Sequence, residues 1–292
     1  MEYISAKHIL IRNKSTQWFG TDHTVNLYRG CSHGCIYCDS RSQCYGDDRF
    51  DTVKVKKNAL ELLRDELRRK VRPSFVGMGS MSDPYNPLER ELELTRKALM
   101  LLYAYECGVA VCTKSDLIAR DADLYADMNC QAPVICKLTV TTADDALAAR
   151  VEPGAPSPSR RLKALEGLSR RGIFAGVLLM PALPFLEDSV ENVLSVVDAA
   201  ADAGARFVYP AFGVTLRDRQ RGYYYEQLDR EFPGHREKYE KRYRERYWCP
   251  APAAKELWAA FTRRCGERDL LWEMDAIVHA AQLGADGQMT LF

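Results

Sequence analysis

Three closely spaced cysteines are the residues of this sequence whose types and spacing most directly indicate chemistry. Cys31, Cys35 and Cys38 stand in the segment RGCSHGCIYCD, together with Gly30 and Gly34. Such short spacings let three thiolates converge on one iron–sulfur cluster, and glycine permits the positive φ angles that wrapping the chain around it needs. Three thiolates on a four-iron cluster leave one iron without a protein ligand. That iron can bind another molecule, as the open coordination position of a catalytic metal site does.

A structural zinc site is the alternative for the same cysteines, with His33 or Cys44 as the fourth ligand. Structural zinc sites usually draw their ligands from two short-spaced pairs. The sequence contains no second Cys-x2-Cys pair and no His-x3-His pair. The pattern therefore favours an iron–sulfur cluster over zinc.

Composition excludes several classes of protein. The 292 residues are 47% hydrophobic and 28% charged, which is typical of globular proteins, and the net charge of +1 argues against a surface built to hold a polyanion. The longest apolar run, residues 174–186, is broken by glycine and proline, and the N-terminus lacks the apolar core of a signal peptide. We therefore expect a cytoplasmic protein without a membrane span. In that compartment the ten cysteines favour metal binding or catalysis over disulfides.

Runs of residues that predict strands alternate along the chain with helical patterns. The expected strands are Thr24–Gly30, Ser74–Gly79, Gly108–Cys112, Val134–Thr141, Phe174–Pro181 and Arg206–Pro210. The expected helices include an apolar face from Leu60 to Val71, a second from Leu88 to Leu102, a helix over Ser157–Gly172, and one that begins at an Asp188–Glu191 capping box and ends at Gly204. Six βα units are too few for an eight-stranded barrel. The order therefore predicts an α/β fold, a partial (β/α)6 TIM-like barrel of parallel strands.

The chain changes character after the sixth strand. Residues 217–247 carry ten basic residues, seven acidic residues and six tyrosines, and residues 250–281 predict two more helices. We expect a barrel domain with an N-terminal lead-in over residues 1–212, and a helical C-terminal extension over residues 213–292 packed on it. Tyr239, Tyr243 and Tyr247 recur every four residues, which favours packing against the barrel over stacking on nucleic-acid bases.

Polar residues follow several of the expected strands. In parallel α/β folds, ligands bind at the carboxyl ends of the strands, so these residues are expected at one rim. The cysteines follow strand one, the segment SDP (82–84) follows strand two, KSD (114–116) follows strand three, and two threonines close strand four. Arg217, Arg219 and Arg221 follow strand six, where they would line the mouth or begin a solvated helix. Glu152 and Arg161 are expected to form an ion pair that orders the loop between them.

The ordered set of motifs resembles the radical S-adenosylmethionine (SAM) superfamily, and within it the spore photoproduct lyase-like branch. The matching segments are NLYRGCSHGCIYCDSR, MSDPYNPLE, TKSDLIARD, VEPGAPSPSRRL and the closing QMTLF. The resemblance runs from about Tyr3 to the C-terminus. It implies a [4Fe-4S] cluster held by Cys31, Cys35 and Cys38, with SAM on the fourth iron. It also implies a partner that donates electrons, such as flavodoxin or ferredoxin.

The chemistry that the resemblance implies is reductive cleavage of SAM to methionine and a 5′-deoxyadenosyl radical, which abstracts a hydrogen atom from a substrate. The residues that would contact SAM are Tyr37, Ser82, Lys114, Thr139 and Thr141. Each also has a plain structural explanation. Tyr37 could pack in the core, Ser82 could cap a helix, Lys114 could be a solvated surface lysine, and the threonines could be β-branched strand residues.

The resemblance to the lyase itself is incomplete. The position of its hydrogen-donating cysteine holds Ser80 here, and one position of its tyrosine pair holds Asp39, although Tyr37 is kept. The O–H bond of a serine is too strong to replace a thiol in that role. We therefore expect a radical SAM enzyme that is not the lyase and whose substrate the sequence does not identify. A lyase that repairs nucleic-acid lesions and a zinc-stabilised nucleic-acid-binding module are the alternatives.

Overall fold

The computed structural model describes residues 1–70 and 72–289, with side chains described up to position 283. Val71, the expected end of one helical face, and the last three residues of the QMTLF motif lie outside the described residues. No helix in the described ranges is long and apolar enough to cross a membrane.

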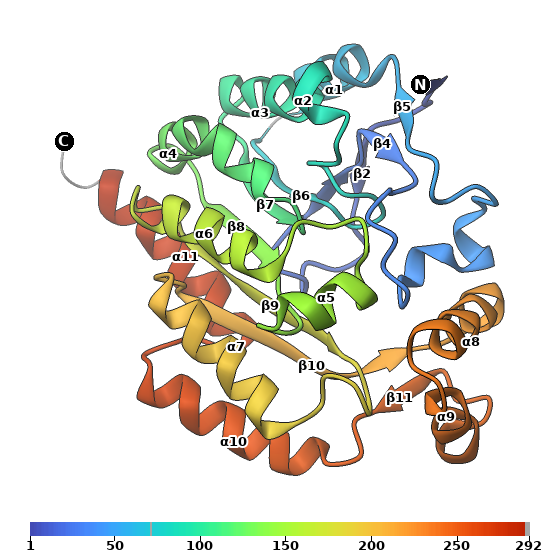
Figure 1. Cartoon of the computed structure of the whole chain (residues 1–292). Coiled ribbons are helices and arrows are strands. Elements are labelled where there is room, and N and C mark those ends of the chain that lie inside the picture. The colour runs from blue at the N-terminus through green and yellow to red at the C-terminus, as the bar shows by residue number, and fades with distance from the viewer. Residues whose placement is uncertain (71, 290–292) are drawn as a thin grey trace.

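A parallel sheet forms the centre of the fold (Figure 1). Its six parallel strands are β3 (His23–Val25), β6 (Phe75–Met78), β7 (Gly108–Thr113), β8 (Val134–Thr139), β9 (Ala175–Ala182) and β10 (Phe207–Thr215), in that spatial order. The antiparallel strands β2 (Leu10–Arg12) and β11 (Trp248–Pro250) flank this set. In the described part of the chain these two edges do not pair with each other, so the barrel is open. The predicted partial (β/α)6 barrel is confirmed.

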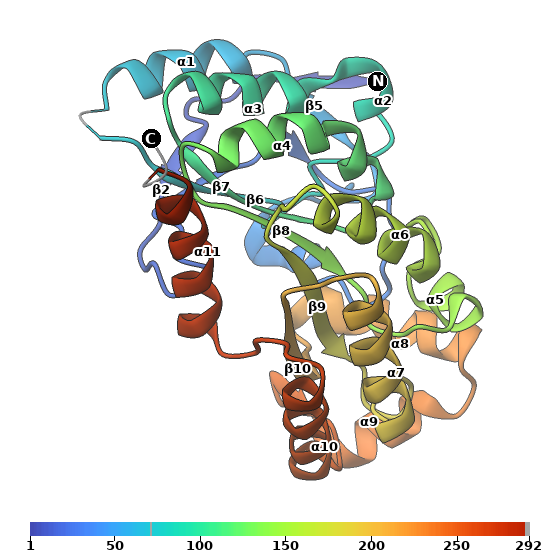
Figure 2. The same ribbon diagram turned by 90° about the vertical axis from the view of Figure 1, so that its left-hand side faces the viewer.

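Helices cover the outer face of the sheet. They are α1 (Ala59–Arg68), α2 (Glu89–Leu92), α3 (Leu94–Ala104), α4 (Ala122–Asn129), α5 (Asp145–Val151), α6 (Pro158–Ser169) and α7 (Val190–Asp202). Figure 2 shows α1, α3, α4 and α6 side by side along the sheet. Alternate strand residues such as Cys136 and Leu138 face these helices in the main hydrophobic core.

The first predicted strand is wrong in one respect, because Thr24–Gly30 forms two strands. After β3 the chain leaves the main sheet, and β4 (Tyr28–Arg29) pairs with β5 (Lys54–Lys56), which also pairs with β1 (Glu2–Ile4). The Lys56 amide donates to the carbonyl of Leu27 at 3.1 Å, so this segment finds its backbone partners outside the main sheet. The cysteine segment therefore follows β4 and not a strand of the barrel.

Two predicted element ends are also wrong. Pro210 does not end its strand, because the pairing with β9 shifts register between Pro210 and Phe212 and β10 then continues to Thr215. Helix α7 is capped by Ser189, whose hydroxyl accepts from the Asn192 amide at 3.1 Å. Asp188 does not cap that helix and accepts instead from the Phe185 amide at 2.7 Å.

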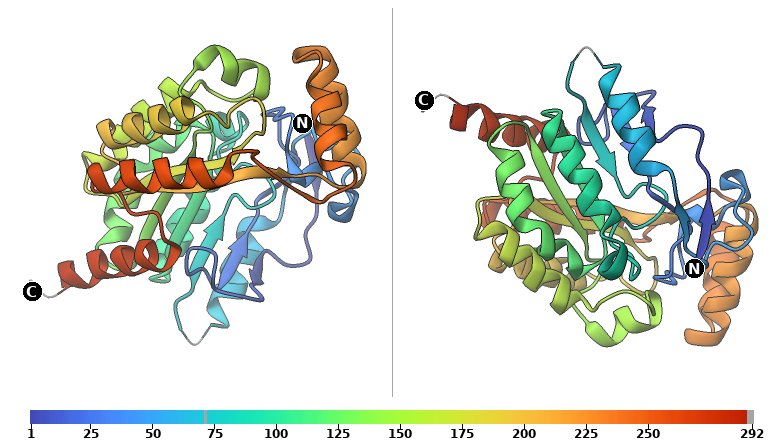
Figure 3. Two further views of the ribbon diagram at one scale, coloured as in Figure 1. Left: turned by 90° about the horizontal axis from the view of Figure 1, so that it is seen from below. Right: turned by 90° about the horizontal axis from the view of Figure 1, so that it is seen from above.

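The C-terminal part packs on two sides of the barrel. Helices α8 (Asp218–Glu231) and α9 (His235–Tyr243) lie beside the cysteine segment, whereas α10 (Ala254–Glu267) packs on α7 and β10. Viewed from below, α10 and α11 (Met274–Met289) lie in the foreground (Figure 3, left). The boundary expected at residue 212 falls within β10, so the division into two domains stays a prediction.

Helix α11 covers the end of the barrel where the parallel strands begin. Its Ile277 and Ala281 pack with Phe19 and Phe207 in a separate cluster that also contains inward-facing strand residues such as Ile135. These apolar side chains fill the end of the barrel where the strands begin. The cavity described below lies above this apolar cluster, towards the carboxyl ends of the strands.

Candidate functional site

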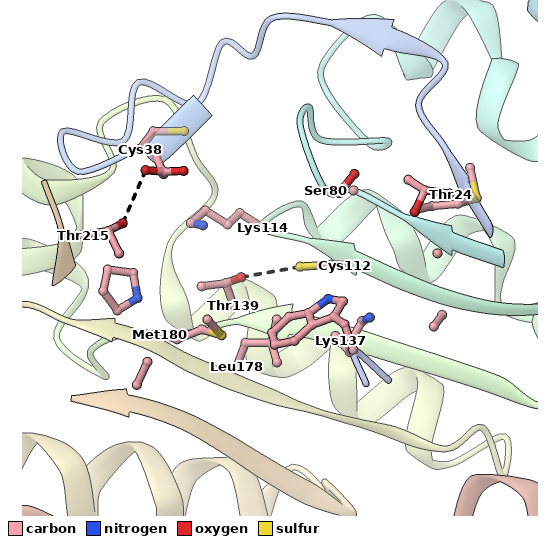
Figure 4. A pocket seen from close by; sticks show the side chains of 18 of the residues that line it. Thr24, Cys38, Ser80, Cys112, Lys114, Lys137, Thr139, Leu178, Met180 and Thr215 are labelled. Atoms are coloured by element: carbon pink, nitrogen blue, oxygen red, sulfur yellow. Dashed lines mark hydrogen bonds between the residues drawn. The ribbon is translucent and has the colours of Figure 1, made fainter. Parts of the chain in front are cut away.

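A cavity of about 540 Å³ occupies the upper interior of the barrel (Figure 4). Its wall includes residues of β6 to β10 together with Tyr37, Cys38 and Asp39 of the cysteine segment. Inward-facing residues two positions apart on β8, Lys137 and Thr139, both line it. The barrel thus carries a cavity at the end where parallel α/β folds bind ligands.

The cysteine segment needs its glycines, as the sequence predicts. Gly30 has φ +79°, and a Cβ there would lie 2.5 Å from the carbonyl oxygen of Thr52. Gly34 has φ +66°, a left-handed conformation that side chains rarely adopt. Backbone bonds fix the segment at both ends, since the Cys31 amide donates to Phe50 at 2.8 Å and the Ile36 amide to Val151 at 3.0 Å.

The three thiols of this segment are close enough to influence one another electrostatically. Burial, with a contribution from Asp83, raises the pKa of Cys31 to about 12, and burial also raises the pKa values of Cys35 and Cys38. Lys114 opposes this effect at Cys35 and Cys38. Within residues 1–70 and 72–289, no three His, Cys, Asp or Glu side chains are already grouped as metal ligands. Ligation by these thiols would require loss of their protons.

Glu152 joins the cysteine segment to the rim of the barrel. Its carboxylate is buried, accepts a hydrogen bond from the Tyr37 hydroxyl, and pairs with Arg161 at 2.6 Å and with Lys114 at 3.8 Å. Arg161 also donates to the carbonyl oxygen of Thr139 at 2.9 Å. The predicted ion pair between Glu152 and Arg161 is confirmed, and it holds both Tyr37 and Lys114 beside the cavity.

Asp83 makes a second connection at the rim. Its carboxylate accepts from the Thr113 hydroxyl at 2.6 Å and from the Lys114 amide at 2.8 Å, and lies 3.0 Å from Nε2 of His33. Although burial disfavours its charge, His33 and these hydrogen bonds lower the pKa of Asp83 to about 2. Nδ1 of His33 contacts the Gly154 carbonyl at 3.3 Å, so both ring nitrogens lie against Asp83 and Gly154. This arrangement disfavours His33 as a zinc ligand.

Three of the five residues expected to contact SAM line the cavity, namely Tyr37, Lys114 and Thr139. Lys114 is not a solvated surface residue, because its side chain is only 17% exposed, and its Nζ lies 5.5 Å from the centre of the Tyr37 ring. Burial disfavours the charge of Lys114, but its interactions with Cys35 and Glu152 outweigh this effect, and the pKa of Lys114 is raised.

Ser82 and Thr141 lie outside the cavity wall. The hydroxyl of Ser82 donates to the carbonyl of Tyr28 at 3.1 Å, and that of Thr141 donates to Glu187 at 2.7 Å. Thr141 also lies beyond β8, which ends at Thr139, so it does not continue the strand face as predicted. Nor does Ser82 cap a helix, because α2 begins only at Glu89.

The arginines after the sixth strand do not line the cavity. Arg217 pairs with Asp39, Arg219 pairs with Asp48, and Arg221 donates to backbone carbonyls of its own C-terminal region. Arg217 therefore connects the start of α8 to the cysteine segment, and Arg219 connects it to the loop that follows that segment. The suggestion that they form an entrance for an anionic substrate is not supported.

The tyrosine stripe packs largely against the protein, as favoured from the sequence. Tyr239 and Tyr243 are buried, and the Tyr239 hydroxyl donates to the carbonyl of Pro184 at 2.9 Å. Tyr247 lies beyond the end of α9 and is exposed.

The sequence matches a known protein family over more than half of its length. Residues 25–197 match the Radical SAM superfamily. This match covers more than half of the chain and includes the three cysteines and the strands from β6 to β9. The chain belongs to the radical SAM superfamily.

Curated relatives match more than half of the chain. The uncharacterized protein Rv2578c of Mycobacterium tuberculosis is 36% identical over 242 residues, which cover 80% of this chain and 71% of the relative. The uncharacterized protein MJ0683 of Methanocaldococcus jannaschii is 32% identical over 178 residues, 60% of this chain and 65% of the relative.

Solved structures of spore photoproduct lyase share the fold. One variant of that enzyme superposes with a TM-score of 0.68 at 14% identity, covering 91% of this chain and 78% of the other. Another, with bound AdoMet and dinucleoside spore photoproduct, superposes with a TM-score of 0.65 at 14% identity and the same coverage. At this level of identity the likeness concerns the fold alone.

Radical SAM proteins are enzymes that use a [4Fe-4S] cluster and SAM. The site of this chain is chemically suited to both. It offers three thiols on one short loop, which is the donor type that iron–sulfur clusters require. Lys114, Tyr37 and Thr139 at the adjoining cavity wall offer a cation, an aromatic ring and a hydroxyl to a charged nucleoside.

Sequence reasoning did not single out Lys137 or Trp18, which both line the cavity. Lys137 lies on the inner face of β8, and Trp18 lies between β2 and β3, with the centre of its ring 5.9 Å from Nζ of Lys137. A lysine within the buried strand VICKLT is the signal that could have identified the first. Nothing in the sequence pattern around Trp18 indicates its place.

Proposed function

We propose that this chain reductively cleaves SAM at a [4Fe-4S] cluster bound by Cys31, Cys35 and Cys38 and uses the resulting 5′-deoxyadenosyl radical to take a hydrogen atom from an organic substrate. The observation that carries this proposal is the position of the cysteine segment, whose Cys38 lines the same cavity as Lys114 and Thr139. A thiol-bound cluster at that position would adjoin a space enclosed by the barrel.

The residues around the cavity have separate proposed roles. Lys114 neutralises the carboxylate of SAM, and Tyr37 lies against its adenine. The hydroxyl of Thr139 offers a hydrogen bond. Glu152 positions Tyr37 and Lys114 and does not itself touch SAM, because Arg161 occupies its other carboxylate oxygen. Ser82 and Thr141 act indirectly, through the hydrogen bonds that their hydroxyls donate to Tyr28 and Glu187 outside the cavity wall.

The substrate of this proposed reaction is not the one that spore photoproduct lyase uses. Ser80 lines the cavity, and its hydroxyl donates to Asn26 at 3.3 Å. Asp39 pairs with Arg217. Neither residue supplies the weak X–H bond that a hydrogen-atom relay requires. Incubation with the thymine photoproduct, SAM and dithionite should release no thymine, and efficient repair would overturn this part of the proposal.

The ligand assignment is tested by replacing single cysteines in the full chain. Cys31→Ser, Cys35→Ser and Cys38→Ser should each lose most of the iron, the sulfide and the brown absorption after anaerobic reconstitution. Cys44→Ser is the matched control, because Cys44 is exposed and only six residues beyond Cys38. It should retain them all. Retention of a complete cluster by one of the first three variants, or its loss from the control, would contradict the assignment.

A further inference from the structure

Lys137 is a buried cation on the inner face of the barrel. The residue is 1% exposed, and its Nζ lies 4.1 Å from the centre of the Phe19 ring and 5.9 Å from that of Trp18. No carboxylate among the described side chains lies within ion-pair distance of its Nζ, which also has no hydrogen-bond acceptor among them. Charged groups with such a degree of burial are normally paired.

The position of Lys137 places it deeper in the cavity than the proposed SAM residues. It precedes Thr139 by two residues on the same face of β8, which is about 7 Å along a strand. Its direct neighbour on β7 is Cys112. In Figure 4, Lys114 and Lys137 lie on opposite sides of Thr139. Lys114 is directed towards the cysteine segment, whereas Lys137 lies near the rings of Phe19 and Trp18, at what we call the floor of the cavity.

The charged groups around the cavity leave Lys137 without a counterion among the side chains that the structure describes. Asp39 pairs with Arg217, and Glu152 pairs with Arg161 and Lys114 on the far side of Thr139. The titratable groups that influence the pKa of Lys137 are the thiols of Cys112 and Cys136. Burial lowers the pKa of Lys137 to about 8, and these two thiols oppose the effect. Most of the lysine is therefore still charged near neutral pH.

We infer that Lys137 binds an oxyanion of the substrate, a carboxylate or a phosphate, at the floor of the cavity. This inference rests on the proposed function, because it assumes that SAM occupies the rim. An oxyanion would complete the coordination of the ammonium group in a site of low polarity, where an ion pair is strong. Anchoring the substrate below Thr139 would fix which of its carbon atoms faces the SAM end of the cavity.

The cavity fits a small molecule that carries such a group on an apolar body. Its inner wall contains Leu178, Met180 and the indole of Trp18 beside Lys137. Specificity would therefore come from one charge-assisted contact at the floor and from apolar contacts around it.

The test is calorimetric titration of the reconstituted full chain, saturated with SAM and without reductant, using benzoate, phenyl phosphate and the neutral benzyl alcohol as probes. Saturating SAM keeps the probes out of the SAM site. At least one anion should bind at millimolar concentration or below, and benzyl alcohol should bind at least tenfold more weakly. The better anion distinguishes a carboxylate substrate from a phosphate substrate.

Variants connect that binding to Lys137. Lys137→Met should weaken the binding of the anion at least tenfold, Lys137→Arg should retain it, and Lys163→Met on the exposed face of α6 should bind like the wild type. Methionine suits the apolar floor, and thermal unfolding of each variant checks that it is folded. Binding to the wild type should fall roughly tenfold between about pH 7 and pH 9, because deprotonation of a group with a pKa near 8 removes the charge.

The inference is overturned if neither anion binds, if benzyl alcohol binds equally well, or if Lys137→Met binds like the wild type. These outcomes are separate from failure of the proposed function. A wild-type protein that binds the anions through Lys137 and yet leaves SAM uncleaved under dithionite would contradict the radical chemistry and leave the anion site standing.

Discussion

At the scale of single residues, the buried ion pair of Glu152 and Arg161 is the contact that most directly supports the site. Both side chains are 1% exposed, and Glu152 also holds the Tyr37 hydroxyl. A buried pair contributes little net stability, but removal of one partner leaves the other charge unpaired and costs about 3–5 kcal/mol. The pair therefore matters most as a device that keeps Tyr37 and Lys114 in place.

We predict that Glu152→Gln lowers the free energy of unfolding by about 3 kcal/mol, because the guanidinium of Arg161 then lacks its counterion. Urea denaturation followed by circular dichroism measures this loss. The double variant Glu152→Gln with Arg161→Met should recover part of it. A single variant as stable as the wild type would show that Arg161 is adequately paired by the backbone carbonyls of Pro156 and Thr139 alone.

The sequence predicts residues whose chemistry is local better than residues whose role depends on how the strands are arranged in the barrel. The three cysteines, their two glycines and the Glu152–Arg161 pair are recognisable from short motifs. Lys137 is not, because a single lysine in a run of buried strand residues shows its inward position only when β8 is placed between β7 and β9. The family resemblance implied SAM contacts for Ser82 and Thr141, whereas in this structure their hydroxyls form hydrogen bonds outside the cavity wall.

At the scale of elements, the loops that follow β8 and β9 are joined through a buried carboxyl. Glu187 is 0% exposed, and its side chain accepts from the Thr141 hydroxyl at 2.7 Å and from the Leu183 amide at 3.1 Å. Burial raises the pKa of Glu187 to about 8 despite these hydrogen bonds. The carboxyl is therefore mostly neutral in the folded protein at neutral pH.

This pKa makes the connection between the loops sensitive to pH. Between about pH 5 and pH 8 the folded protein retains a proton on Glu187 that the unfolded chain has lost, so stability falls as the pH rises. We predict that the wild type loses up to about 1.4 kcal/mol per pH unit relative to Glu187→Gln across this range. The amide can donate to Thr141 and accept from Leu183, and it does not titrate. Parallel pH profiles of the two proteins would refute the prediction.

Element order was predictable, but element ends were not. The alternation of apolar runs and helical periods correctly indicates six parallel strands. Pro210 suggested an end to the last strand, whereas a register shift carries β10 on to Thr215 and brings β11 into the sheet. Such ends depend on pairing with strands that are distant in sequence, which local patterns do not contain.

At the scale of the whole molecule, apolar side chains fill one end of the barrel, and the cavity with the candidate site lies towards the other end. Helix α11 and Phe19 fill the end where the strands begin, although more than 250 residues separate them in the sequence. The cysteine segment and α8 flank the opposite end. Both arrangements join segments that are far apart in the sequence, so only the folded chain reveals them.

The central claim is that this chain performs radical SAM chemistry with the cysteine segment as the cluster site. The most direct measurement is chromatographic quantification of 5′-deoxyadenosine after anaerobic reconstitution and incubation with SAM and dithionite, with Cys35→Ala as the control. We predict a brown protein that releases 5′-deoxyadenosine only when all three cysteines are present. A colourless protein that retains zinc and leaves SAM intact, or equal release by the Cys35→Ala variant, would contradict this claim.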